Sequence, residues 1–557
     1  MAKRKLGSSI KLVVIAMLTV GVTNVVSSTL PALTMSVSKA DSRYQTTMTT
    51  TNQAGQHDQR HLVTGKHIDH VSNGTGFVQV FPNRRRQTFT GVGGALTDSA
   101  ASVIQKSRPQ TRRQILTAYF GAQGARYTNL RLTIGSADFS TFGYTYAKQA
   151  TPATFSLKPD DVHVSPVLQQ ILKQAPNVQI MAAPWAPPKW MKVSHRRDGQ
   201  NFLVNNALKR SAMPAYADYL VKYVDAQQRR GVAIKTLSLQ NELQASSPWE
   251  AMTWTPDAAA TFITHYLGPK LKARHPQTKI MVWDYVKSDA TQPIMMGFNQ
   301  WTQKFYAHRG VHQYVDSVGV HWYAASLNAQ MSLGNLSGQP AWDDNFNNLD
   351  RFHRQQPLQQ IIATEAAQEK GVWLNQWTPA ARYGYDIIND FEHHVQGYLD
   401  WNLVLNGQGG PTHAAVNPCG APINVLHAGT SKEQLVINPA YYVLKRVSRD
   451  VQPGAVSVAS TTNRQLDHTA ILQHDGSTRL LLENRSSQVR TVQAVIGHRA
   501  YKVRLTPHSF NSLRLPKQTA KNLKTPPITH TPTSLKRLSR FDNHWLTPIY
   551  RFLGLQD

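Results

Sequence analysis

Cysteine is nearly absent from this chain, which has a single one, Cys419, among its 557 residues. A lone cysteine excludes an intramolecular disulfide. Cys419 stands in the loop-like stretch Asn417-Pro418-Cys419-Gly420, without the histidine context of a nucleophilic thiol, and we expect it to be incidental. The 22 histidines are dispersed, and the adjacent pair His393-His394 points to different helix faces, so the sequence predicts no metal site.

Acidic residues are scarce as well: 32 Asp and Glu face 60 Lys and Arg, a formal net charge of +28. Such an excess suggests an anionic partner, either a nucleic acid or a cell-wall polymer. The basic residues are scattered, with small clusters at residues 84–86 and 536–537. No nucleic-acid motif and no interleaving of aromatic and basic residues is present, so we expect no nucleic-acid partner. Solvated surface charge and retention by an anionic cell-wall polymer are the two open interpretations.

Long apolar runs are missing, apart from residues 12–26 near the N-terminus. That run is interrupted by Thr19 and Gly21 and is short for a membrane span. Basic residues 3–5 precede it and small residues 38–40 follow it, the order of an export signal. We therefore predict a cleaved signal at residues 1–40 and a secreted protein, free or associated with the cell wall, without a transmembrane span after cleavage.

The middle of the chain alternates between apolar runs of strand length and amphipathic segments of helix length, such as residues 212–230, 256–274 and 379–394. Eight such alternations predict a (β/α)8 barrel over residues 89–439. The predicted strands are residues 89–95, 128–134, 178–185, 234–242, 279–285, 315–323, 358–365 and 397–405. A doubly wound sheet would more often carry a phosphate-binding glycine loop, whereas Gly91-Val92-Gly93-Gly94 indicates a tight backbone approach at the barrel mouth.

The segments that flank the barrel differ in character. Residues 41–60 are rich in Thr, Gln and Ser and are expected to be a disordered lead-in. Residues 440–516 show short alternating strands with turn signals such as Asp475-Gly476, and residues 61–88 are expected to join them in a β-sandwich built from both chain ends. Residues 517–557 form a basic tail that is expected to be weakly ordered, or to contact a wall or membrane surface.

Two of the predicted strands end on a glutamate, Glu242 and Glu365. A buried parallel strand that ends on a carboxylate is how a β/α barrel presents catalytic groups at its mouth. Two carboxylates that face one pocket are the requirement of glycoside hydrolysis, in which one gives a proton and the other attacks or activates water. The sequence therefore predicts an enzyme that acts on sugars.

A series of motifs falls at the predicted strand ends in a characteristic order. The motifs are Thr90-Gly91-Val92-Gly93-Gly94-Ala95, Ala137-Asp138-Phe139-Ser140, Ala183-Pro184-Trp185-Ala186-Pro187-Pro188, Gln240-Asn241-Glu242, His321-Trp322-Tyr323, Ala363-Thr364-Glu365-Ala366 and Asp400-Trp401-Asn402. Over about residues 75–515 the chain resembles glycoside hydrolase family 30, and within it the glucosylceramidase-like branch.

The resemblance implies a retaining double displacement without a cofactor. Glu242 would be the general acid/base and Glu365 the nucleophile, with carboxyl groups about 5–5.5 Å apart. The acid needs a raised pKa to stay protonated, and Arg131 at the end of the second strand would keep Glu365 ionised. His321 and Tyr323 at the end of the sixth strand would line the pocket, with Tyr323 bonded to the nucleophile, or would pack behind it.

The resemblance also implies the residues that hold the sugar. Asn241 would bond the 2-hydroxyl, a contact that strengthens in the transition state. Asp138 would bind a distal hydroxyl and reject substrates that lack it. Trp185 and Trp401 offer flat apolar faces that match a pyranose ring.

Two departures from the branch leave the substrate open. The chain reads Gly409-Gly410-Pro411-Thr412-His413 where the branch has Gly-Gly-Pro-Asn-Trp, so Thr412 puts the sugar in question, and Asp284-Tyr285 is expected to reshape the aglycone side. A carbohydrate or glycolipid substrate is expected, with β-glucosides first and glucosylceramide, a sphingolipid, as the reference. A β-1,6-glucan, a β-xyloside, a β-fucoside, or a catalytically silent wall-associated carbohydrate-binding protein are the alternatives.

Overall fold

The computed structural model describes residues 44–69, 71–72, 76–147, 154–199, 205–289, 296–323, 342, 344–463, 465–518 and 528–529. The predicted signal at residues 1–40 and nearly all of the predicted tail at 517–557 lie outside these residues. Within the described part of the chain, none of the helices combines the length and the apolar character that a bilayer crossing requires.

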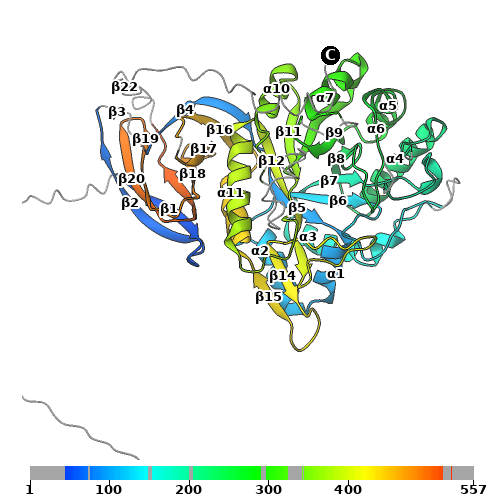
Figure 1. The fold of residues 1–557 in the computed structure, drawn as a ribbon, viewed down its shortest axis with the longest axis horizontal. Coiled ribbons are helices and arrows are strands. Elements are labelled where there is room, and N and C mark those ends of the chain that lie inside the picture. Colours follow the sequence, from blue (N-terminus) through cyan, green and yellow to red (C-terminus); the bar gives the residue numbers. More distant parts are fainter. Residues whose placement is uncertain are drawn as a thin grey trace, which may run out of the picture. The chain divides into compact units, whose positions relative to one another are not determined.

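Eight parallel strands close into a barrel in chain order, which confirms the predicted (β/α)8 fold (Figure 1). The strands are β5 (Gly91–Leu96), β6 (Asn129–Ile134), β7 (Gln179–Pro184), β8 (Ile234–Ser238), β9 (Lys279–Val286), β10 (Val315–His321), β11 (Gln360–Glu365) and β12 (Val395–Asn402). Pairing of β12 with β5 completes the ring. Nearly every strand residue is buried, as expected for strands covered on both faces.

The first barrel strand depends on glycine for a close approach. A Cβ on Gly93 would lie 1.8 Å from the carbonyl oxygen of Asn129, the first residue of β6. Any other residue at position 93 would force β5 and β6 apart. The close approach predicted for this motif therefore exists, but at Gly93 it lies where β6 begins and not at the barrel mouth.

Helices follow the strands around the barrel (Figure 1). They are α1 (Asp98–Lys106), α2 (Pro109–Phe120), α3 (Val164–Gln174), α4 (Met213–Arg229), α5 (Pro256–Phe262), the π-helical turn η6 (Ile263–Leu267), α6 (Gly268–Arg274), α7 (Phe298–Tyr306), α10 (Asn347–Gln355), α11 (Trp377–Glu392) and α12 (Pro439–Asp450). Short 3-10 turns are η3 (Lys158–Asp161), η4 (Lys189–Met191), η5 (Arg210–Ala212) and η7 (Arg309–Gln313). Three further strands, β13 (Val404–Asn406), β14 (Ile423–Leu426) and β15 (Gln434–Ile437), form a small sheet after the barrel.

The predicted β-sandwich is also present and uses both flanks of the chain. Its strands are β1 (Gln45–Asn52), β2 (Gln59–His67), β4 (Phe77–Thr88), β16 (Val456–Ser460), β17 (Asp467–Leu472), β18 (Thr478–Asn484), β19 (Arg490–Ile496), β20 (Arg499–Leu505) and β21 (Ser509–Leu515), and β3 (Val71–Ser72) pairs with β22 (Ile528–Thr529). Its own apolar core includes Val78, Leu480 and Leu513. The ladder runs without interruption from β1 through the other strands to β21, which pairs with β1 again.

Two expectations for the flanks were wrong. The disordered lead-in at residues 41–60 contains β1, in which Met48 is buried and pairs with Leu513 of β21. Threonine is β-branched and favours strands, so a Thr-rich segment with one buried face is not a sign of disorder. The region from residue 440 begins with helix α12, which packs on α11, and the strands of this region start at Val456.

Candidate active site

The carboxyl ends of the barrel strands enclose a cavity of about 180 Å³. Seven of the nine predicted site residues line it, and the other two, Arg131 and His321, contact its glutamates. The lining residues are Asp138, Phe139, Trp185, Asn241, Glu242, Trp249, Tyr323, Glu365, Ala367, Glu369, Trp401, Asn417 and Cys419. Residues from far apart in the sequence thus meet at the edge where a barrel presents its chemistry.

Glu242 and Glu365 both approach the same ring nitrogen of His321. One carboxylate oxygen of each and one ring nitrogen of His321 all lie within 4.8 Å of one another. His321 Nδ1 is 3.2 Å from Glu242 Oε1 and 3.9 Å from Glu365 Oε1. Glu242 does not end a strand as predicted: β8 stops at Ser238, and Glu242 sits in the following turn with a positive φ of 48°.

Asp284 is the buried carboxylate that holds this group together, and the sequence analysis assigned it to the aglycone side. It accepts hydrogen bonds from Arg131 at 3.0 Å, Ser238 at 2.8 Å and Thr364 at 2.6 Å, and lies 3.1 Å from His321 Nε2. Asp284 is fully buried and does not line the cavity, so the expectation that it shapes the aglycone side is wrong. The rule that found the two glutamates, a carboxylate at the end of a buried strand, applies to Asp284 equally.

A break in the ladder of β9 aims Asp284 inward. Trp283 and Asp284 have positive φ values of 70° and 50°, and the register between β9 and β10 shifts at this point. Left-handed backbone is uncommon for residues other than glycine and costs free energy, which the surrounding contacts must offset. The bulge and the hydrogen bonds of Asp284 together fix His321 and Arg131.

The charges around His321 shift its protonation and that of its neighbours. Burial acts to lower the pKa of His321, but Glu365, Asp284 and Glu242 outweigh it and raise the pKa to about 9. Burial acts to raise the pKa of Asp284, but Arg131 and His321 outweigh it and lower the pKa. At neutral pH His321 is therefore an imidazolium that donates from both ring nitrogens. Its positive charge between the carboxylates disfavours binding of a metal cation by the same three side chains.

Glu365 is held from two sides. Arg131 Nη1 donates to Oε2, and the Tyr323 hydroxyl donates to Oε1 at 3.0 Å. Burial raises the pKa of Glu365 above its ordinary value, while His321 and Arg131 act in the opposite direction. Each fixed donor stabilises the ionised form and sets the direction of the free lone pairs.

Asn241 shares the same arginine. Its Oδ1 accepts from Arg131 Nη2 at 2.8 Å, and its backbone N–H donates to the carbonyl of Pro184 at 2.9 Å. Since the side-chain oxygen is engaged and the residue lines the cavity, its amide NH2 group is left to donate towards a bound molecule.

Asp138 has a partner that the sequence analysis missed. Asn417 Nδ2 donates to Asp138 Oδ2 at 3.1 Å, and both residues line the cavity. Burial, followed by the charge of Glu365, raises the pKa of Asp138 well above its ordinary value. Thr412, the residue that left the identity of the sugar open, does not line the cavity. The same loop instead places the side-chain amide of Asn417 in the cavity.

Trp185 and Trp401 stack on each other, with ring centroids 5.1 Å apart and planes inclined by 22°. The guanidinium carbon of Arg131 lies 5.1 Å and 5.2 Å from the two rings. Both tryptophans line the cavity, but their mutual stacking leaves at most one face of each for a sugar. The half-buried Trp249 at the same cavity is a further aromatic surface that the sequence analysis did not name.

Cys419 also lines the cavity, although the sequence analysis treated it as incidental. Burial and then the charge of Asp138 raise the pKa of its thiol well above the ordinary value. A thiol that keeps its proton is a poor nucleophile, so Cys419 contributes shape to the cavity.

A barrel whose strand ends bring two carboxylates to one small cavity is the architecture of a glycoside hydrolase. Residues 89–451 match the glycosyl hydrolase family 30 TIM-barrel domain, and residues 454–513 match the family's β-sandwich domain. The chain belongs to glycosyl hydrolase family 30.

Known proteins of similar sequence and structure carry more than one name. The chain is 29% identical over 433 residues to the lysosomal acid glucosylceramidase of Mus musculus, which covers 74% of this chain and 78% of the relative. It is 25% identical over 421 residues to an endo-1,6-beta-D-glucanase of Neurospora crassa, with 72% and 80% covered. The crystal structure of SrfJ from Salmonella typhimurium superposes with a TM-score of 0.74 at 25% identity, covering 85% of this chain and all of that one.

Proposed function

We propose that this protein is a retaining β-glycosidase for β-glucosidic bonds, with Glu242 as acid/base and Glu365 as nucleophile. The observation that carries the proposal is the approach of the two carboxylates, with one oxygen of each within 4.8 Å of the other. Retaining enzymes hold their carboxyl groups about 5–5.5 Å apart, whereas inverting enzymes leave about 6.5–9.5 Å for a water molecule.

The chemistry runs in two displacements. Glu242 protonates the glycosidic oxygen while Glu365 attacks the anomeric carbon, which breaks the glycosidic bond and forms a glycosyl ester with Glu365. Glu242 then takes a proton from a water molecule as the oxygen of that water attacks the anomeric carbon. This attack breaks the glycosyl ester, which releases the carboxylate of Glu365 and the free sugar. Arg131 and Tyr323 hold the nucleophile in line, and His321 holds the carboxylate of Glu242 beside it.

The sugar-binding side of the cavity favours a pyranose with free hydroxyls. Asn241 is placed to donate to the 2-hydroxyl, and the pair of Asp138 and Asn417 to bind hydroxyls at the other end of the ring. A cavity of about 180 Å³ is smaller than the roughly 300–1,000 Å³ of pockets for drug-sized ligands, which supports recognition of one sugar ring.

Glucosylceramide-like glucosides and β-1,6-linked glucans are the two substrate classes to compare, because relatives of both names match this chain. The test is hydrolysis of aryl β-glucoside, β-xyloside and β-fucoside, of glucosylceramide and of β-1,6-glucan, with NMR assignment of the first anomer released. We expect glucoside turnover with retention, absent in Glu365→Gln. Sugar binding without turnover of any substrate would favour the silent binding protein, and an inverted product would overturn the mechanism.

We also propose that the protein is exported, with residues 1–40 as the signal. The order of basic, apolar and small residues in that segment supports this. N-terminal sequencing of the protein from culture medium and from cells tests it, since a mature form that starts near residue 41 is expected only in the medium.

A further inference from the structure

The sandwich contains an opening between two neighbouring strands. β2 pairs with β20 only at Gly65, Lys66 and His67, where the partners are Tyr501, Ala500 and Arg499. Residues 59–64 of β2 pair with β1 alone, and residues 502–505 of β20 pair with β19 alone. The two strands therefore separate along residues 59–64 of β2 and residues 502–505 of β20.

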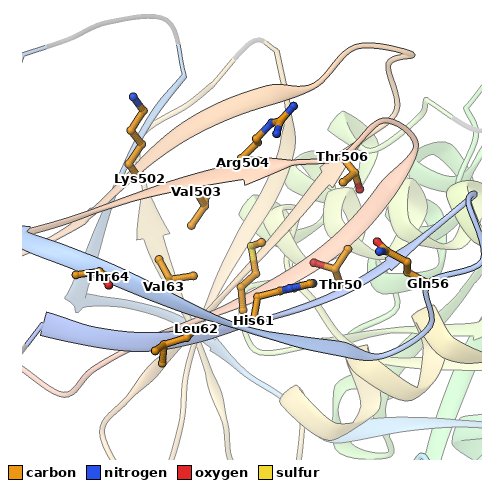
Figure 2. A pocket seen from close by; sticks show the side chains of 11 residues that line it. Thr50, Gln56, His61, Leu62, Val63, Thr64, Lys502, Val503, Arg504 and Thr506 are labelled. Atoms are coloured by element: carbon orange, nitrogen blue, oxygen red, sulfur yellow. The ribbon is translucent and has the colours of Figure 1, made fainter. Parts of the chain in front are cut away.

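Two adjoining cavities follow this opening, one of about 360 Å³ and one of about 520 Å³. They share Thr64 and Lys502, and we call their combined lining the β2–β20 groove. None of its residues lines the catalytic cavity. Figure 2 shows Val63 and Val503 turned towards each other across the opening, while Lys502 and Arg504 project from the opposite side of β20.

The charge of the β2–β20 groove is of one sign. Its ionisable residues are Lys66, Lys502, Arg504 and His61, all exposed, and no Asp or Glu lines either cavity. Neither the two lysines nor Arg504 takes part in an ion pair within the described part of the chain. Lys502 and Arg504 share one face of β20, and their cross-strand neighbours Gln493 and Thr491 are neutral. Like charges placed together without a counterion repel each other, and a bound anion would relieve that repulsion.

The remaining lining indicates the kind of anion. The exposed Thr64 hydroxyl, the Gln493 side chain and the amide nitrogen of Gln56 offer hydrogen bonds to a polyhydroxylated molecule. No Phe, Tyr or Trp lines the groove, so it lacks the stacking surface of a single-stranded nucleic-acid site. The site is concave and runs through two cavities, a shape that suits a chain more than a single ion or a membrane plane.

We propose that the β2–β20 groove binds an acidic polysaccharide, with Lys66, Lys502 and Arg504 paired to its carboxylate groups. The site is independent of the catalytic cavity and gives the sandwich a function of its own, which is to hold the enzyme on an anionic glycan while the barrel acts on a glucoside.

The test measures binding of the full chain to polygalacturonate by affinity electrophoresis and calorimetry, with neutral dextran and duplex DNA as comparison ligands. Lys502→Glu/Arg504→Glu is the groove variant. Arg113→Glu/Lys173→Glu changes the net charge equally at two exposed barrel residues and is the matched control. We expect salt-sensitive binding of polygalacturonate, a loss of tenfold or more in the groove variant, no loss in the control, and unchanged hydrolysis of an aryl β-glucoside in both.

Three results would overturn the proposal. Equal weakening in both variants would mean that binding follows overall charge, and absence of polygalacturonate binding would exclude the ligand class. Tighter binding of DNA than of polygalacturonate, lost in the groove variant, would reassign the groove to nucleic acid. If Lys502→Glu/Arg504→Glu melts at a lower temperature than the parent, Lys502→Ala/Arg504→Ala replaces it. Alanine removes half as much charge as glutamate reverses, so a loss of about threefold in affinity is then expected.

Discussion

At the scale of single residues, the site separates the two glutamates by their contacts. Glu365 is buried and is fixed by Arg131 and Tyr323. Glu242 lies in a turn, and of Arg131, Tyr323 and His321 it contacts only His321. A nucleophile benefits from a fixed direction of attack, and an acid/base that must serve both the leaving group and water benefits from a less crowded position. Their different surroundings lead to different predictions for the two alanine variants.

The activity lost on removing Glu365, the proposed nucleophile, should be partly recoverable with a small external anion. Glu365→Ala should lower kcat by at least about 10³-fold, because no covalent intermediate forms. Azide, which fits the space left by the carboxylate, should restore part of the rate and give a glycosyl azide of inverted configuration. Rates and product NMR on an aryl β-glucoside measure this, with Glu369→Ala, a neighbouring glutamate in the same cavity, as the control. Azide rescue in that control, or none in Glu365→Ala, would contradict the assignment.

The loss of rate on removing Glu242, the proposed acid/base, should depend on the leaving group. Glu242→Ala should slow substrates with a poor leaving group by about 10²–10⁴-fold, since the departing oxygen needs a proton. A dinitrophenyl glucoside, which leaves without protonation, should form the glycosyl ester almost as fast as in the parent. Burst kinetics on a series of aryl glucosides measure the slope. Equal loss across the series would mean that Glu242 acts in another way.

His321 makes part of the stability dependent on pH. Its folded-state pKa of about 9 lies above its ordinary value of 6.5, so its contribution is fully present below about pH 6.5 and is lost as the pH rises through about 9. A shift of this size corresponds to a few kcal/mol, on the order of 1.4 kcal/mol per unit. Thermal melting of the parent and of His321→Gln from pH 6 to pH 10 should show a fall between these limits in the parent only. The same slope in both proteins would refute the linkage.

At the scale of elements, the strands and most of the site were predictable because strand ends have a strong local signature. The eight apolar runs predicted the order of the barrel strands, and charged or polar residues at the ends of several runs, such as Glu242, Glu365 and Tyr323, indicated the mouth. Asp284 is also a carboxylate near the end of an apolar run, but its difference from the glucosylceramidase-like branch led to the expectation that it shapes the aglycone side. The bulge that turns it inward cannot be recognised from a single sequence. Asn417 and Trp249 lie on long loops, whose course depends on contacts that sequence periodicity does not encode.

The packing of helix α11 on the sandwich gives an element-scale prediction. A Cβ on Gly384 would lie 2.6 Å from Glu483 Oε1 and 2.9 Å from Phe510 Cδ2. Gly to Ala within a helix normally stabilises by up to about 1 kcal/mol, but overpacking costs about 1–3 kcal/mol, so Gly384→Ala should destabilise. Chemical denaturation measures the change. Adding Glu483→Ala, which removes the carboxyl group nearest to the new methyl, should recover stability relative to Gly384→Ala, and no recovery would place the conflict elsewhere.

At the scale of the whole molecule, the sandwich needs both ends of the described chain. β1 pairs with β2 on one side and with β21 on the other, so a segment near the start and a segment near the end close the same sheet. A chain that begins at residue 44 should therefore melt like the full chain, while one that begins at residue 54 should melt earlier, because β2 and β21 lose a partner and the apolar core that Met48 covers becomes exposed. Met48→Ala in the full chain is the milder version and should cost about 2–5 kcal/mol, as for other buried large-to-small changes. Differential scanning calorimetry and hydrolysis of an aryl β-glucoside follow the sandwich and the barrel in the same samples. If the chain that begins at residue 54 kept the full melting temperature, β1 would be dispensable, and β2 and β4 would suffice as the N-terminal part of the sandwich.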